Sequence, residues 1–111
     1  MDKQLLVERA ERLLTNLRLH GVEVQAYRWS PVYTGSPNAS YRLGIVIPAL
    51  RNQSIRERSQ FLTERIFDIF EPGERGKIYS VLSYDTIEEM NQNLDEREGV
   101  GRPVVEPYWP D

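Results

Sequence analysis

The sequence predicts an α+β fold: a two-layer sandwich in which helices cover one face of a three-stranded mixed sheet. Three observations predict it. Apolar residues recur at helical spacing in some segments and at every second position in others. These segments follow one another in the order α-β-β-α-β-α. A helix also separates the last two strands, as a parallel pair requires, whereas the first two suit an antiparallel hairpin.

The composition is that of a single globular domain. With 111 residues, 40% of them hydrophobic and 28% charged, the chain is large enough for one core. We assign residues 1–98 to one α+β domain and residues 99–111 to a tail rich in glycine and proline. No apolar run approaches the roughly 20 residues that span a bilayer. We therefore expect a cytoplasmic protein that makes no membrane contact.

The first helix is predicted over residues 4–20, where Gly21 supplies a stop signal. Its buried stripe is formed by five apolar residues: Leu6, Ala10, Leu13, Leu14 and Leu17. His20 lies in the last turn, where a cation complements the helix dipole, so we expect it to cap the helix. Residues 22–29, VEVQAYRW, alternate between apolar and polar side chains and predict a strand buried on one side.

The middle of the chain predicts a loop, a strand and a second helix. Residues 30–40 contain two prolines and a glycine, which indicates a long loop, and a strand follows until Pro48 ends it. Ser54 and Glu57 form a capping-box pattern that predicts the start of the helix. We expect a buried stripe along this helix: Ile55, Leu62, Ile66, Ile69 and Phe70.

The stretch GKIYSVLSYDTIEEM, residues 76–90, predicts a strand that runs directly into a helix. Residues 77–84 alternate with the period of a strand, and Thr86 with Glu89 repeats the capping-box pattern. Ile87, Met90 and Leu94 then give the last helix an apolar side. The polar end of the strand raises the question of chemistry there, but a helix start at Thr86 explains the turn without it.

Three stretches resemble a known family of small α+β proteins. VEVQAY, the loop with Gly35, and YRLGIVI are similar to its first hairpin. NQSIRERSQFL is similar to its helix start, with Ser54 and Arg58 at matching positions. IYSVLSYDTIEEM resembles its closing strand, turn and helix, with Met90 in place of an aromatic residue. Together these stretches, within residues 5–92, resemble the BolA-like family, whose fold is related to the type II KH domain.

The resemblance implies the architecture of that family but not its cofactor. In the family, a histidine near the start of the closing strand helps to hold an iron–sulfur cluster shared with a monothiol glutaredoxin. This chain has Ile78 or Tyr79 there, and the Arg-His-Arg motif of the family is replaced by residues 58–60, RSQ. Such a cluster needs imidazole or thiolate ligands. We therefore expect no cofactor.

Few residues in the sequence are suited to catalysis. There is no cysteine, and the single histidine, His20, ends a helix distant from the serines, so a serine nucleophile lacks a base. A divalent-cation site is the alternative interpretation of the acidic residues near the last helix: Asp85, Glu88, Glu89, Asp95, Glu96 and Glu98. Carboxylates at a helix start also complement its dipole, and no calcium loop orders these. We predict neither catalytic residues nor a metal site.

A basic group surrounds the start of the second helix: Arg51, Arg56 and Arg58. In KH-type folds this neighbourhood binds a nucleic-acid backbone with a GXXG loop. Here the loop is ALRNQS, and the 17 acidic and 14 basic residues give a net charge of −3, whereas nucleic-acid-binding domains are normally basic. A solvated helix face is therefore the first interpretation and a nucleic-acid site the second.

Four aromatic residues are candidates for a protein contact: Trp29 and Tyr33 beside the long loop, and Tyr108 and Trp109 in the tail. Exposed aromatic residues commonly anchor protein interfaces. The alternative is that the tail docks on the hairpin and buries them. We predict a non-catalytic adaptor or regulator that uses these residues, with the three arginines as a rim, to bind a protein partner or a second copy of the chain. The alternatives are a KH-like nucleic-acid-binding module and an enzyme with a carboxylate-based site.

Overall fold

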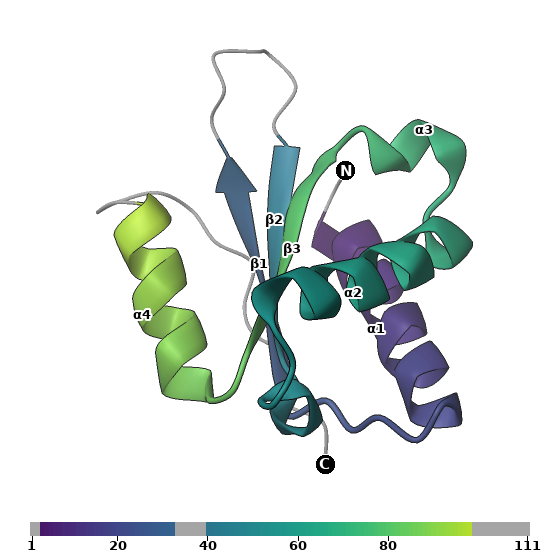
Figure 1. Ribbon diagram of the computed structural model, residues 1–111. Helices are drawn as coiled ribbons and strands as arrows, with labels where there is room; N and C mark the ends of the chain where they lie inside the picture. Colours follow the sequence, from purple (N-terminus) through teal and green to yellow (C-terminus); the bar gives the residue numbers. More distant parts are fainter. Residues whose placement is uncertain (1–2, 33–39, 99–111) are drawn as a thin grey trace.

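The computed structural model describes residues 3–32 and 40–98. Its elements, in order, are α1 (Lys3–Leu19), β1 (Ala26–Val32), β2 (Ser40–Val46), the 3-10 helix η1 (Pro48–Leu50), α2 (Ile55–Ile69), α3 (Pro72–Arg75), β3 (Ile78–Tyr84) and α4 (Ile87–Glu98). This order confirms the predicted α+β fold, to which the structure adds the short helices η1 and α3 (Figure 1). Within the described ranges, no helix has the length and apolar character needed to cross a bilayer.

The three strands form one mixed sheet in the order β1-β2-β3. β1 and β2 pair antiparallel, from Ala26 opposite Val46 to Val32 opposite Ser40. β2 and β3 pair parallel, because the intervening α2 returns the chain to the same end of the sheet. The prediction of a mixed sheet is confirmed, and β1 and β3 are its two edge strands.

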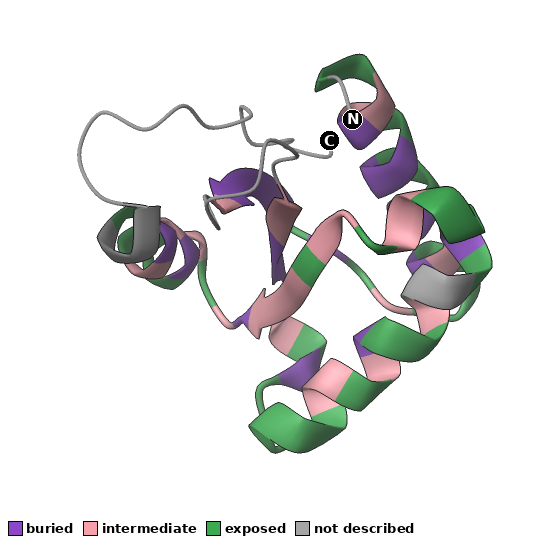
Figure 2. Cartoon of the chain, turned by 90° about the horizontal axis from the view of Figure 1, so that it is seen from above, coloured by how far each residue is buried: buried purple, intermediate pink, exposed green. Residues whose placement is uncertain are grey.

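Helices cover both faces of this sheet, so the prediction that they cover one face needs correction. α1 and α2 lie on one face, as predicted, whereas α4 lies on the opposite face (Figure 1, Figure 2). The α4 face has its own apolar cluster: Ala26, Val46, Tyr84, Met90 and Leu94. Gly44 permits the close approach of α4, because a Cβ atom there would lie 2.8 Å from Leu94 Cδ1. The predicted two layers describe α1, α2 and the sheet, and α4 adds a third layer.

β1 begins at Ala26 rather than at Val22, which shifts the predicted first strand along the chain. The Gln25 N–H donates to the Val46 carbonyl at 2.9 Å just before the strand pairing begins. The strand continues through Pro31, which an edge strand tolerates. The expected burial on one side only is also wrong. α4 covers the face of Ala26, which the sequence pattern assigned to the core, and α1 and α2 cover the opposite face, which contains Tyr27 and Trp29.

The end of α1 confirms the predicted stop signal. Gly21 has a φ angle of 77°, which favours glycine. The N–H groups of Gly21 and Val22 donate to the carbonyls of Arg18 and Leu17 at 3.0 and 2.9 Å, which is a Schellman motif. The ring Nδ1 of His20 lies 2.8 Å from a backbone carbonyl oxygen one turn earlier. His20 therefore has the structural role at the helix end that was expected.

Hydroxyl caps define the starts of α2 and α4. The Ser54 hydroxyl accepts a hydrogen bond from the Glu57 amide at 3.1 Å, and the Thr86 hydroxyl accepts one from the Glu89 amide at 3.1 Å. Each bond satisfies one of the amides that a helix start leaves without a partner. Both predicted helix starts are confirmed.

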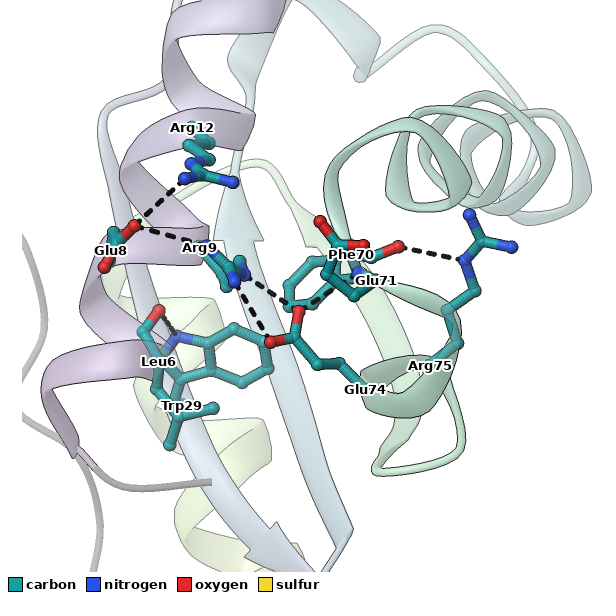
Figure 3. Close-up of polar contacts among 9 residues, drawn as sticks. All are labelled: Leu6, Glu8, Arg9, Arg12, Trp29, Phe70, Glu71, Glu74 and Arg75. Carbon is teal, nitrogen blue, oxygen red and sulfur yellow. Dashed lines mark hydrogen bonds and ion pairs between the residues drawn. The ribbon is translucent and has the colours of Figure 1, made fainter.

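Trp29 lies in the centre of the core, which corrects the prediction of an exposed aromatic residue. Its side chain is 0% exposed, and its indole N–H donates to the Leu6 carbonyl at 2.9 Å (Figure 3). The rings of Tyr41 and Phe70 meet the indole edge-on, with centroids 6.4 and 6.1 Å away. The shift of β1 moves Trp29 from the predicted strand end to the middle of the strand. It therefore joins α1, β1, β2 and the end of α2.

An ion pair connects α1 to α3 beside this tryptophan. Arg9 donates from Nε and Nη2 to the two carboxylate oxygens of Glu74 at 2.8 and 3.1 Å (Figure 3). The carboxylate also accepts the Glu71 amide at 3.0 Å. Hydrogen bonding to the guanidinium lowers the pKa of Glu74 below its ordinary value. The short helix α3 is thus held against α1.

The hydroxyl caps predict a stability change. Ser54→Ala and Thr86→Ala each remove the acceptor of a helix-start amide, so each should lower the free energy of unfolding by about 1 kcal/mol in urea titrations. Thr63→Ala is the matched control, because Thr63 is exposed inside α2 and caps nothing. Cap variants that unfold at the wild-type midpoint would show that these hydroxyls do not stabilise the helices.

The Arg9–Glu74 pair predicts a pH dependence. A carboxyl group whose pKa is lower in the folded state stabilises the fold above its unfolded pKa, and this contribution is lost as the pH falls through the folded pKa. The ordinary pKa of Glu74 is 4.5, so the loss falls below that pH. Glu74→Gln should lower the free energy of unfolding at pH 7 and make the decline of that free energy in acid shallower. Glu11→Gln, at an exposed position of α1, should have neither effect. Equal acid slopes for all three proteins would contradict this role.

Trp29→Phe removes the indole N–H and part of the ring that fills the core. The loss of the bond to Leu6 and the space left behind should together lower the free energy of unfolding by about 1–3 kcal/mol. Tyr79→Phe is the control, because the Tyr79 side chain is 59% exposed. A Trp29→Phe protein as stable as this control would contradict the central position of Trp29.

Candidate functional site

A pocket of about 280 Å³ lies at the carboxyl end of β3, between the start of α2 and one side of α4. We call it the β3 groove, and it is lined by Ile55, Arg58, Ser59, Leu82, Ser83, Tyr84, Glu89 and Asn93. These residues come from three elements that meet there because β3 ends beside α2 and turns directly into α4 (Figure 1). The strand end singled out in the sequence is therefore also the floor of this groove.

The α2 wall of the groove combines an exposed apolar residue with a fixed cation. Ile55 is 80% exposed, which corrects its assignment to the buried stripe of the helix. Arg58 is largely buried and donates from Nε to the Gln53 carbonyl at 3.1 Å. Its Nη2 lies 3.1 Å from Asp85 Oδ1, a distance that makes an ion pair. Arg58 thus holds the start of α2 against the residue that follows β3.

The floor of the groove is the last part of β3. The Ser83 hydroxyl is buried and has no hydrogen-bond partner within residues 3–32 and 40–98. A buried hydroxyl without a hydrogen-bond partner costs free energy. The Tyr84 hydroxyl, in contrast, donates to the Asn93 side chain and fixes α4 beside the strand.

The α4 wall is acidic at its start. Glu89 is exposed, and the Thr86 hydroxyl fixes its backbone amide in the first turn. Glu88 is its exposed neighbour. Over the described part of the chain, no three histidine, aspartate or glutamate side chains lie close enough together to hold a metal ion. Of the described carboxylates of α4, Glu88 and Glu89 are exposed, and Asp95 forms an ion pair with Arg28 at 2.8 Å.

The predicted binding residues lie in different parts of the structure and do not form one site. Arg58 lines the groove, and Arg56 is exposed in the same helical turn as Ile55. Arg51 is exposed directly after η1. Trp29 is in the core, as described above. Three predicted residues lie outside the described ranges: Tyr33, Tyr108 and Trp109.

Sequence reasoning missed Ile55 as a surface residue, although a signal was present. A buried stripe needs apolar residues three or four positions apart along the helix. Between Ile55 and Leu62 those positions hold Arg58 and Ser59, so the stripe is interrupted before it reaches the first turn. The polar lining from α4 carried no such signal, because it depends on which face of the sheet α4 covers.

The groove is suited to binding. Ile55 and Leu82 offer apolar contact, and a cationic and an anionic side chain, Arg58 and Glu89, lie on opposite walls. Such a combination of apolar surface and a few placed polar groups is typical of recognition sites. No protein-family model, curated protein or solved structure matches this chain.

Proposed function

We propose that this chain is a cytoplasmic, non-catalytic adaptor or regulatory domain with a BolA-like arrangement, and that it binds a protein partner at the β3 groove. The observation that carries the proposal is the 80% exposure of Ile55 at the wall of the groove. Covering an exposed isoleucine removes apolar surface from water and contributes about 1.5–3 kcal/mol. A partner that seats an apolar side chain against Ile55 and Leu82 gains this contribution.

The surrounding polar groups supply specificity for such a partner. Arg56 is exposed on α2 next to Ile55, and Glu89 is exposed on the α4 wall. Charges at the rim of an interface direct the orientation and rate of association more than they increase its affinity. The two walls carry opposite charges, so a partner whose charges complement both walls binds in one orientation.

Nucleic-acid binding is the second candidate function, and one observation favours it. Arg51 and Arg56 are both exposed around the start of α2. The third arginine of the group, Arg58, is engaged by Asp85, which reduces its value for a phosphate. The net charge of −3 also opposes a polyanion at long range. A protein partner therefore accounts for more of the groove.

The proposal predicts which surface substitution abolishes partner binding. Ile55→Glu places an anion where the partner is expected to bury an apolar side chain, and an acidic residue suits a helix start. Leu19→Glu is the matched control, because Leu19 is 81% exposed at the end of α1. Both variants should unfold within about 0.5 kcal/mol of wild type.

Affinity capture from the native cell then compares the three proteins. Proteins retained by wild type and by Leu19→Glu should be lost with Ile55→Glu. Equal retention by both variants would contradict binding at the groove. Binding of a single-stranded DNA oligonucleotide that weakens steeply between about 50 and 200 mM salt, and that is lost on Arg51→Gln and Arg56→Gln, would support the nucleic-acid function instead.

A further inference from the structure

The two edge strands of the sheet differ in their protection. β1 carries Pro31 and is buried along almost its whole length. β3, with the sequence IYSVLSY, contains no proline and no charged residue and is half-buried for most of its length (Figure 2). Natural proteins usually protect an open edge with proline, charge or a covering element, because its free peptide groups pair with other chains. The β3 edge lacks the first two forms of protection.

The direction of the peptide groups shows which of them face this open edge. The Ile47 N–H donates to the Tyr84 carbonyl at 3.1 Å, so the peptide groups of Tyr84 face β2. Successive residues of a strand alternate in this direction. Leu82 therefore also faces β2, and the N–H and C=O groups of Val81 and Ser83 face away from it. Among the described residues, β3 pairs with β2 alone.

The β3 groove is the space beside this edge. Its floor is residues 82–84, its wall on one face of the sheet is the start of α2, and its wall on the other face is α4. Walls on both faces leave room for one extended chain in the plane of the sheet. A second copy of this domain would bring an edge flanked by its own α2 and α4, which would meet these walls.

The charges of the two walls also determine which side chains suit a strand placed there. Side chains of a strand point alternately to the two faces of a sheet. Those on the α2 side would meet Ile55, whose neighbour along the helix is the exposed cation Arg56, and those on the α4 side would meet Glu89. Charge complementarity therefore favours apolar or acidic side chains on the first side and basic side chains on the second.

We propose that β3 accepts an extended segment of a protein partner as a fourth strand, with its main chain bonded to Val81 and Ser83. Its side chains alternate between apolar or acidic residues toward α2 and basic residues toward α4. This inference rests on the proposed function and specifies its mode: main-chain hydrogen bonds supply affinity, and the alternate side chains supply selectivity.

A phage-displayed library of random ten-residue peptides, selected on the full chain, tests this mode. The selected peptides should show the alternation described above. Ser83→Pro removes an edge-facing N–H and should weaken their binding about tenfold or more. Alternate N-methylation of one selected peptide gives a second readout on the unmodified domain, so the test stands even if Ser83→Pro does not fold.

Methylation of every second peptide amide should abolish binding, and methylation of the intervening amides should not. Selected peptides that tolerate all methylations and Ser83→Pro, or a selection that enriches no peptide, would overturn strand addition. A concentration-dependent dimer in analytical ultracentrifugation that Ser83→Pro dissociates would also overturn it, by assigning the edge to a second copy. If captured partners are lost with Ile55→Glu but tolerate Ser83→Pro, protein binding at the groove stands and strand addition fails.

Discussion

The hydrogen bond from the Trp29 indole to the Leu6 carbonyl is the contact on which the arrangement of this domain depends. It places the largest side chain of the core between α1 and the sheet, where Tyr41 and Phe70 meet its ring. Because Phe70 directly follows α2, the same ring fixes where that helix ends. The Arg9–Glu74 pair then holds α3 to α1 on the same side of the core. Because β3 begins soon after α3, this ion pair also holds the start of β3 in place.

This packing determines which surface is left open. The carboxyl-terminal end of α2 is anchored in the core, whereas its first turn extends to the carboxyl end of β3 and exposes Ile55. On the opposite face, the close contact of Leu94 with Gly44 sets the position of α4. The groove is therefore a consequence of two independent packing contacts, one on each face of the sheet, and the strand between them keeps an open edge.

Much of the fold could be predicted because its signals are local. The Gly21 stop and the Ser54 and Thr86 caps depend on neighbouring residues in the sequence, and the structure confirms all three. The face covered by α4, the register of β1 and the burial of Trp29 depend on contacts between distant segments, which periodicity does not contain. The site was predicted only in part. Arg58 lines the groove, but Ile55 was assigned to the core although Arg58 and Ser59 interrupt the apolar stripe, and the lining from α4 depends on a contact between distant segments.

Amide hydrogen exchange of the free domain, followed by NMR, is the measurement that shows whether the edge of β3 is open. The amides of Leu82 and Tyr84 face β2 and should exchange slowly, while those of Val81 and Ser83 face solvent and should exchange rapidly. Such alternation along one strand would show that the edge is free to receive another chain. Equally slow exchange at all four amides would show that the edge is already covered and would contradict an open β3 edge.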